Sequence, residues 1–195
     1  MPKLSITIMA HVSRRQYFDY LRERLGNVPF SIDDGSLGIW ENCKRAWRLH
    51  DKNSEFSLVV QDDAIICENF LKKAEKILKE DAVYSFYLGR PRYYESVKFV
   101  KENGLKEIVT RHIGNEVALA MRTERIANMI DFCDRHGADR DTWINNWAKA
   151  RGLKIIYPMP SLIDHRDEAT LHNGNKGKYR RVATWFADDK ELRKP

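Results

Sequence analysis

The chain has 195 residues, of which 43% are hydrophobic and 11% aromatic; this composition excludes disordered and fibrous proteins and fits one folded domain. The formal net charge of +6 favours an anionic partner such as a nucleotide, a nucleic acid or an acidic glycan. The three cysteines, Cys43, Cys67 and Cys133, form no CxxC pair, which argues against a disulfide framework and against a zinc knuckle.

The apolar runs of the sequence are shorter than the roughly 20 residues that a membrane helix needs. The first run, residues 4–10, also lacks the flanks and the small-residue cleavage pattern of a secretory signal, so we interpret it as a buried strand. The sequence therefore predicts a soluble, cytoplasmic protein without a membrane span.

Apolar runs of strand length alternate with stretches of helical period, which predicts an α/β fold. In the first half, we expect strands at residues 4–10, 28–32, 56–60 and 85–88, and helices at 14–25, 37–49 and 69–80. Residues 91–110 are polar and irregular, as in an excursion or a hairpin. In the second half, we expect strands at 116–121 and 153–157, and helices at 123–135, 141–151 and near 180–187.

Two pairs of acids follow predicted strands, and parallel strands joined by helices bind ligands at their carboxyl ends. Asp62 and Asp63 come directly after the strand at 56–60, with Gln61 before them. Carboxylates that bind Mg²⁺ or Mn²⁺ commonly bridge the ion to phosphate, so this pair predicts a metal site. The alternative is that the acids stabilise the N-terminus of the next helix through its dipole. Asp33 and Asp34 end the strand at 28–32, where a turn is an equally good interpretation.

The segment from Gly38 to Phe70 carries the patterns G-x-W-x-N-x-x-R-A-W and Q-D-D-A-x-x-C-x-x-F, separated by an apolar strand. It resembles small GT-A-type glycosyltransferases of phages and bacteria and, more loosely, the lipopolysaccharide-type family. The resemblance continues over residues 137–165 and leaves residues 90–111 unmatched. It implies a single GT-A-like domain over residues 1–195, with a mixed, mostly parallel, Rossmann-like sheet flanked by helices.

In that family the acid pair is the counterpart of the DxD motif, although Gln61 stands here in place of the first Asp. The resemblance implies that residues 1–89 bind the nucleotide sugar and that residues 112–195 complete the acceptor and metal sites. It further implies transfer of a sugar from a nucleotide sugar, with UDP-sugars as the first candidates, to an acceptor hydroxyl. A phage-encoded enzyme of this kind works in the host cytoplasm.

The resemblance also implies the roles of individual residues. Asp62, Asp63 and His165 are the expected ligands of Mn²⁺ or Mg²⁺, and a neutral imidazole suits Mn²⁺. The expected donor-binding residues are His11, Ser13, Arg14, Asp33, Asp34, Asp62, Lys178, Arg180 and Arg181. Surface, capping or structural roles are the alternatives for His11, Ser13, Arg14 and His165, and a solvated basic tail or a nucleic-acid contact is the alternative for the residues near 176–181.

The resemblance implies that an Asp in this part of the chain is the catalytic base of an inverting transfer; the candidates are Asp139, just before the helix predicted at 141–151, and Asp141, at its start. Capping of that helix is the alternative for both. For the acceptor, the basic charge favours a 5-hydroxymethylpyrimidine in DNA, with a cell-surface glycan as the alternative. A non-catalytic nucleic-acid-binding α/β module and a nucleotidyltransferase are the rival classes. Residues 4–15 contain no glycine, whereas a nucleotidyltransferase is expected to carry a glycine-rich phosphate signature there.

Overall fold

The structure is a computed structural model that describes residues 3–89, 91–136, 143–168 and 181–193. Its strands are β1 (Leu4–His11), β2 (Phe30–Asp33), β3 (Phe56–Gln61), β4 (Ala64–Ile66), β5 (Val83–Ser85), β6 (Glu107–Thr110), β7 (Ala118–Arg122), β8 (Ile155–Pro158) and β9 (Ile163–His165). Its α-helices are α1 (Phe18–Leu25), α2 (Ile39–Arg48), α3 (Phe70–Ile77), α4 (Tyr94–Glu102), α5 (Ile126–His136) and α6 (Trp143–Ala150). Short 3-10 helices occupy η1 (Val12–Tyr17), η2 (Pro91–Tyr93) and η3 (Thr123–Arg125).

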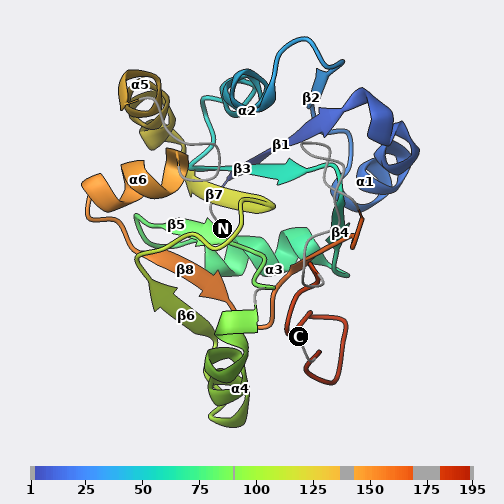
Figure 1. Ribbon diagram of the computed structural model, residues 1–195, viewed down its shortest axis with the longest axis vertical. Helices are drawn as coiled ribbons and strands as arrows, with labels where there is room; N and C mark the ends of the chain where they lie inside the picture. Colours follow the sequence, from blue (N-terminus) through green and yellow to red (C-terminus); the bar gives the residue numbers. More distant parts are fainter. Residues whose placement is uncertain (1–2, 90, 137–142, 169–180, 194–195) are drawn as a thin grey trace.

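A seven-stranded sheet in the order β2-β1-β3-β7-β5-β8-β6 forms the centre of the molecule (Figure 1). Strands β1, β2, β3, β5 and β8 run in one direction, and β7 and β6 run against them. Five of the residues in β3 form a continuous buried run, as is typical of a strand covered on both faces. The predicted fold class, an α/β domain with a mixed, mostly parallel sheet flanked by helices, is confirmed.

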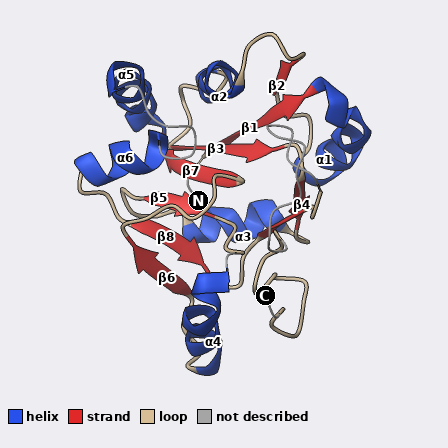
Figure 2. Ribbon diagram, viewed as in Figure 1, coloured by secondary structure: helices blue, strands red, loops and turns tan. Residues whose placement is uncertain are grey.

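The sheet divides the apolar core into two layers because alternate side chains of each strand point to opposite faces. Helices α1 and α3 pack on one face, against residues such as Leu58 of β3. Helices α2, α4, α5 and α6 contribute to the layer on the other face, which includes Val59. Figure 2 shows the helices on either side of the strands. The sheet is therefore fixed from both sides, and its strand ends form a stable platform for a site.

A second, two-stranded sheet pairs β4 with β9 in antiparallel register, with Ala64 opposite His165. The carboxyl ends of β1 and β3 point towards the side of the molecule on which β4 lies (Figure 1). Sequence patterns did not predict β4, because its three residues lie in the apolar part of the acid-pair motif. This small sheet joins the end of β3 to a segment from the far end of the chain.

Several of the expected elements differ from the structure. The strand expected at 85–88 lies earlier, at Val83–Ser85, and the start of the helix expected at 14–25 is the 3-10 helix Val12–Tyr17. Residues 91–110 contain the helix α4 and the edge strand β6 rather than irregular chain, since Val97 and Val100 pack into the core. The prediction of a short closing helix near 180–187 is wrong for the described residues 181–187. There, Phe186 instead forms an isolated β-bridge with Ser161. No helix in the described parts of the chain has both the length and the apolar composition that crossing a membrane requires.

Candidate functional site

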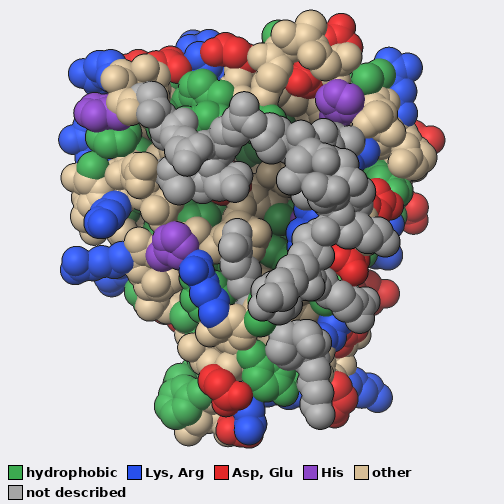
Figure 3. All heavy atoms as spheres, viewed as in Figure 1, with side chains coloured by type: hydrophobic (Ala, Val, Ile, Leu, Met, Phe, Trp, Pro, Cys, Tyr) green, Lys and Arg blue, Asp and Glu red, His purple; other side chains and the backbone are tan. Residues whose placement is uncertain are grey.

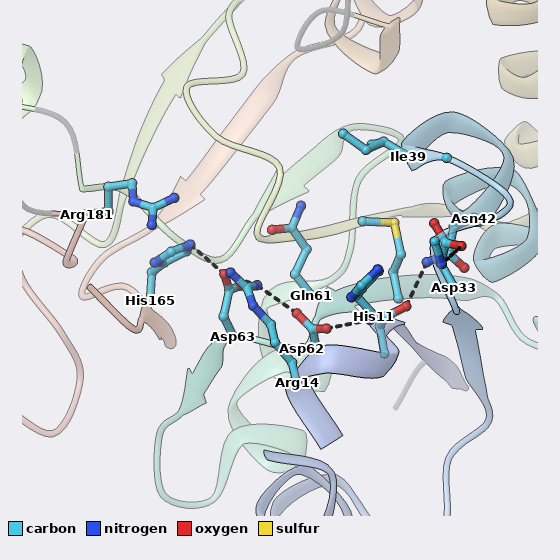
Figure 4. A pocket seen from close by; sticks show the side chains of 14 residues that line it. His11, Arg14, Asp33, Ile39, Asn42, Gln61, Asp62, Asp63, His165 and Arg181 are labelled. Carbon is cyan, nitrogen blue, oxygen red and sulfur yellow. Dashed lines mark hydrogen bonds and ion pairs between the residues drawn. The ribbon is translucent and has the colours of Figure 1, made fainter. Parts of the chain in front are cut away.

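A cavity of about 430 Å³ opens at the carboxyl ends of three adjacent parallel strands. Strand β1 contributes Met9, Ala10 and His11, β2 contributes Asp33, and β3 and the turn after it contribute Gln61, Asp62 and Asp63. The start of α2 closes one side with Gly38, Ile39 and Asn42, and the opposite side is formed by His165 and Arg181 (Figure 4). This volume is within the usual range for a small-molecule site.

The cavity brings together many of the residues that sequence analysis selected. Those that line it are His11, Arg14, Asp33, Asp62, Asp63, His165 and Arg181. Ser13 and Asp34 are exposed and lie outside the lining, where they hydrogen-bond with His11 and Ser36 respectively. Asp139, Asp141, Lys178 and Arg180 lie outside the described residues, so their roles stay predictions.

Arg14 links the two acids that follow β3. Its Nη1 atom donates to Asp62 Oδ1 at 2.9 Å and also to Asp63 Oδ2. The other oxygen of Asp62, Oδ2, accepts a hydrogen bond from the backbone N–H of His11 at 2.6 Å. Asp62 and Asp63 are only 3% and 2% exposed, so these contacts replace the water that the carboxylates lose on folding.

The pairing of β4 with β9 brings His165 to the same cluster. Ala64, the residue after the acid pair, lies opposite His165 in the register, and Arg166 N–H donates to the carbonyl of Asp63 at 3.0 Å. As a result, His165 Nε2 lies 3.2 Å from Asp63 Oδ2. Figure 4 shows His165, Asp63, Arg14 and Asp62 as one connected row of side chains.

The two acids have their pKa values shifted in opposite directions. Burial raises the pKa of Asp62 above its ordinary value, in spite of the hydrogen bonds from His11 and Arg14. Burial acts in the same direction on Asp63, but there His165 and Arg14 outweigh it and lower the pKa. Neighbouring carboxylates in such different environments are suited to different roles.

The contacts of the acids do not fit the divalent cation that the resemblance implies. Among the described residues, no three His, Cys, Asp or Glu side chains are placed to share one metal ion. Both carboxylates are bound to Arg14, so a cation held by both would have to displace the guanidinium. Within the described part of the chain, Asp63 Oδ1 and His165 Nδ1 are the atoms of this cluster that are buried without a hydrogen-bond partner. A guanidinium thus lies where a cation between the acids is expected.

The other end of the cavity is shaped by the loop between β2 and α2. Asp33 Oδ1 accepts hydrogen bonds from the N–H groups of Gly35 at 2.8 Å and Leu37 at 3.1 Å. Burial acts to raise the pKa of Asp33, but these N–H donors outweigh it and the pKa is lowered. Gly35 and Gly38 have backbone φ angles of 102° and 78°, values that residues other than glycine rarely adopt. Asp33 thus forms the turn that sequence analysis named as an alternative, and it also lines the cavity.

Asn42 is a lining residue that sequence analysis did not select, although it belongs to the motif that starts at Gly38. Its Nδ2 donates to the carbonyl of Ala10 at 2.9 Å, and its Oδ1 accepts from Ser31 Oγ at 2.6 Å. Arg45 Nε donates to the same Ser31 hydroxyl at 2.8 Å. This network fixes the start of α2 against β1 and β2. The signal in the sequence was a polar residue within an otherwise apolar stripe of the helix.

The described part of the C-terminal segment brings Arg181 to the cavity. Asp164, next to His165, accepts a hydrogen bond from Ala183 N–H at 2.5 Å and is bound by Arg193. Arg181 N–H donates to Asp167 Oδ1 at 3.1 Å, and its side chain donates to the carbonyl of Glu168. Figure 4 places the Arg181 side chain beside His165.

The indole of Trp40, in the first turn of α2, packs against that of Trp143 at the start of α6, with 4.8 Å between ring centroids. Trp143 is the first described residue after the segment that contains Asp139 and Asp141. Trp143 thus packs on Trp40, the neighbour in sequence of the lining residue Ile39.

No protein-family model matches the chain, and no curated protein matches it either. Among solved structures, the chain is similar to a Bacillus anthracis protein described as a glucose-1-phosphate thymidylyltransferase, crystallised with sucrose. The two are 10% identical, the match covers 83% of this chain and 89% of that one, and the TM-score is 0.48. At this identity and TM-score the likeness does not bear on function.

Proposed function

We propose that this chain is a glycosyltransferase that moves a sugar from a nucleotide sugar, with UDP-sugars as the first candidates, to an acceptor hydroxyl. The observation that carries the proposal is the cavity at the carboxyl ends of β1, β2 and β3. It collects seven side chains that the sequence selected: His11, Arg14, Asp33, Asp62 and Arg181 for donor binding, and Asp63 and His165, with Asp62 again, for the metal site. A non-catalytic nucleic-acid-binding module gives no reason for this convergence.

The two ends of the cavity suit the two parts of a nucleotide sugar. The nucleoside fits the end formed by Asp33, the glycine loop and Asn42, where carboxylate and amide groups can bind hydroxyl and N–H groups. The diphosphate fits the end where Arg14, Arg181 and His165 supply positive or hydrogen-bonding groups. This orientation places the sugar beside the acids at the end of β3.

In the proposed reaction the acceptor oxygen attacks the anomeric carbon of the sugar. The bond between that carbon and the diphosphate oxygen breaks, and the nucleoside diphosphate leaves with both electrons of the bond. The acceptor proton passes to a carboxylate base, for which the resemblance offers Asp139 and Asp141. Because the contacts of Asp62 and Asp63 do not fit a metal ion, no step of this reaction passes through one.

For the acceptor, a 5-hydroxymethylpyrimidine in DNA is the first candidate and a cell-surface glycan the second. DNA binding draws on Lys and Arg contacts to phosphates, and the net charge of +6 supports it. On the face in Figure 3, outside the grey atoms, Lys and Arg side chains are mixed with Asp and Glu rather than gathered in one stripe. The proposal of a DNA acceptor therefore rests on the net charge and the resemblance. The acceptor assay has to include both DNA and glycans.

The test is turnover of a panel of UDP-sugars, with duplex DNA containing 5-hydroxymethylcytosine and with oligosaccharides as acceptors, measured by mass spectrometry of both products. The proposal expects a mass increase of one sugar on an acceptor and release of the nucleoside diphosphate. Release of pyrophosphate would identify a nucleotidyltransferase instead. Binding of DNA without binding of any nucleotide sugar would favour the non-catalytic module.

A further inference from the structure

A guanidinium occupies the space between the two acids at the end of β3. Arg14 reaches this position from η1, directly after β1, and its side chain is 9% exposed. The side chains of Asp62 and Asp63, which it contacts, are 4% and 3% exposed. Removing one partner from a buried group of charges leaves the others uncompensated, so the three charges depend on one another.

Three of the four carboxylate oxygens of the pair already have partners among the described residues. Asp62 Oδ1 and Oδ2 accept from Arg14 and from the backbone of His11, and Asp63 Oδ2 faces both Arg14 and His165. A divalent cation that took two of these oxygens would have to displace a donor. Arg14 keeps its charge at any working pH, so loss of a proton does not make room for the ion.

We propose that Arg14 takes the place between Asp62 and Asp63 that the resemblance assigns to a divalent cation. The free protein then does not bind Mn²⁺ at this pair, and the site binds a nucleoside diphosphate without a metal. The second statement rests on the proposed function, whereas the first does not.

The geometry of Arg14 allows it to face the acids and a phosphate together. Among the described residues, its contacts with the acids all pass through Nη1, which leaves the donors on Nε and Nη2 for other acceptors. Arg14 lines the cavity, as does Arg181, so two guanidinium groups face the space in which the proposed diphosphate lies. Guanidinium groups bind phosphate oxygens through paired hydrogen bonds, which suits this role.

The first measurement is Mn²⁺ binding to the free protein by electron paramagnetic resonance, in which bound Mn²⁺ loses the sharp signal of the hydrated ion. The wild-type protein is expected to leave the signal unchanged. The variant Arg14→Met, which keeps an unbranched side chain without the charge, is expected to bind Mn²⁺ at least about tenfold more tightly, a difference of about 1.4 kcal/mol. Arg15→Ala, at the exposed neighbouring position, is the matched control and is expected to behave as wild type.

Tight binding of Mn²⁺ by the wild-type protein, abolished by Asp63→Asn, would overturn the inference. If Arg14→Met does not fold, the wild-type measurement still decides the matter, because it requires no variant to show that Mn²⁺ binds or does not bind.

The second measurement is calorimetric titration of the wild-type protein with UDP, and then with the other nucleoside diphosphates, in EDTA and in Mn²⁺. The inference expects dissociation constants that agree within about threefold. Binding that is more than about tenfold tighter in Mn²⁺ would overturn it. Absence of binding under both conditions would instead count against the proposed function, and the Mn²⁺ measurement on the free protein would still test the place of Arg14.

Discussion

Ala64 lies opposite His165 in the small β4–β9 sheet, and this pairing sets the imidazole of His165 3.2 Å from the carboxylate of Asp63. The acid pair is thus held from two directions, by Arg14 from the segment after β1 and by His165 from β9. Each of the three segments is anchored in a sheet, so the side chains meet without depending on a flexible loop. Such anchoring suits a site that has to be ready before its substrate arrives.

The acid pair is the first target for mutation under the proposed function. Asp63→Asn removes the charge that Arg14 and His165 face, and we expect the transfer rate to fall by about 10²- to 10³-fold, as for other groups that stabilise charge in a transition state. The measurement is kcat and KM with the best UDP-sugar. Asp19→Asn, whose side chain is 98% exposed, is the control. Full activity of Asp63→Asn would remove the site assignment.

His165 contributes to the site through the polar contact of its imidazole ring with Asp63 rather than by filling space. Asn or Gln at this position keeps a polar group but loses the imidazole contact with Asp63. We expect His165→Gln to raise the dissociation constant of UDP by about tenfold, as the loss of one hydrogen bond to a charged group suggests. Calorimetry measures this constant, and circular dichroism verifies that the fold is kept. An unchanged constant would place His165 outside the donor site.

Asn42 is expected to act through the shape of the cavity. Asn42→Leu leaves the buried carbonyl of Ala10 without its side-chain donor and removes one acceptor of the Ser31 hydroxyl, which costs about 1–3 kcal/mol of unfolding free energy. Urea unfolding measures the loss, and Asn53→Ala, at an exposed position, is the control. We also expect weaker UDP binding, since the start of α2 is no longer fixed. A variant with unchanged stability would show that the network is not a structural support.

Asp33 makes the stability of the β2–α2 turn depend on pH. Its pKa in the folded protein is lower than the ordinary value of 3.8, so its contribution is present above about pH 4 and is lost as the pH falls through the folded-state pKa. We expect Asp33→Asn to reduce the unfolding free energy by about 1 kcal/mol at pH 7 and by less in acid, where the wild type loses the same charge. Urea unfolding of both proteins over this pH range measures the difference. A difference that grows in acid would contradict the assignment.

Much of the fold and part of the site could be predicted from the sequence. The apolar runs of β1 and β3 and the acids that end β2 and β3 are local signals, and the rule for parallel strands places those acids at one edge. The place of Arg14 between the acids was not predictable, because it depends on how η1 turns back towards β3. The contact of His165 with Asp63 depends on β4, which is too short for a periodic pattern.

The C-terminal segment provides the last test, since it brings Arg181 to the cavity. Arg193 binds Asp164, which also holds Ala183 two residues after Arg181. Arg193→Ala leaves Asp164 buried without its cation, and we expect a loss of about 1–3 kcal/mol of unfolding free energy. Because the segment is then held less firmly, we expect Arg193→Ala to weaken UDP binding, as Arg181→Ala does. The double variant is expected to have nearly the same dissociation constant as the weaker-binding single variant. Additive effects of the two substitutions on the dissociation constant would show that Arg193 does not position Arg181.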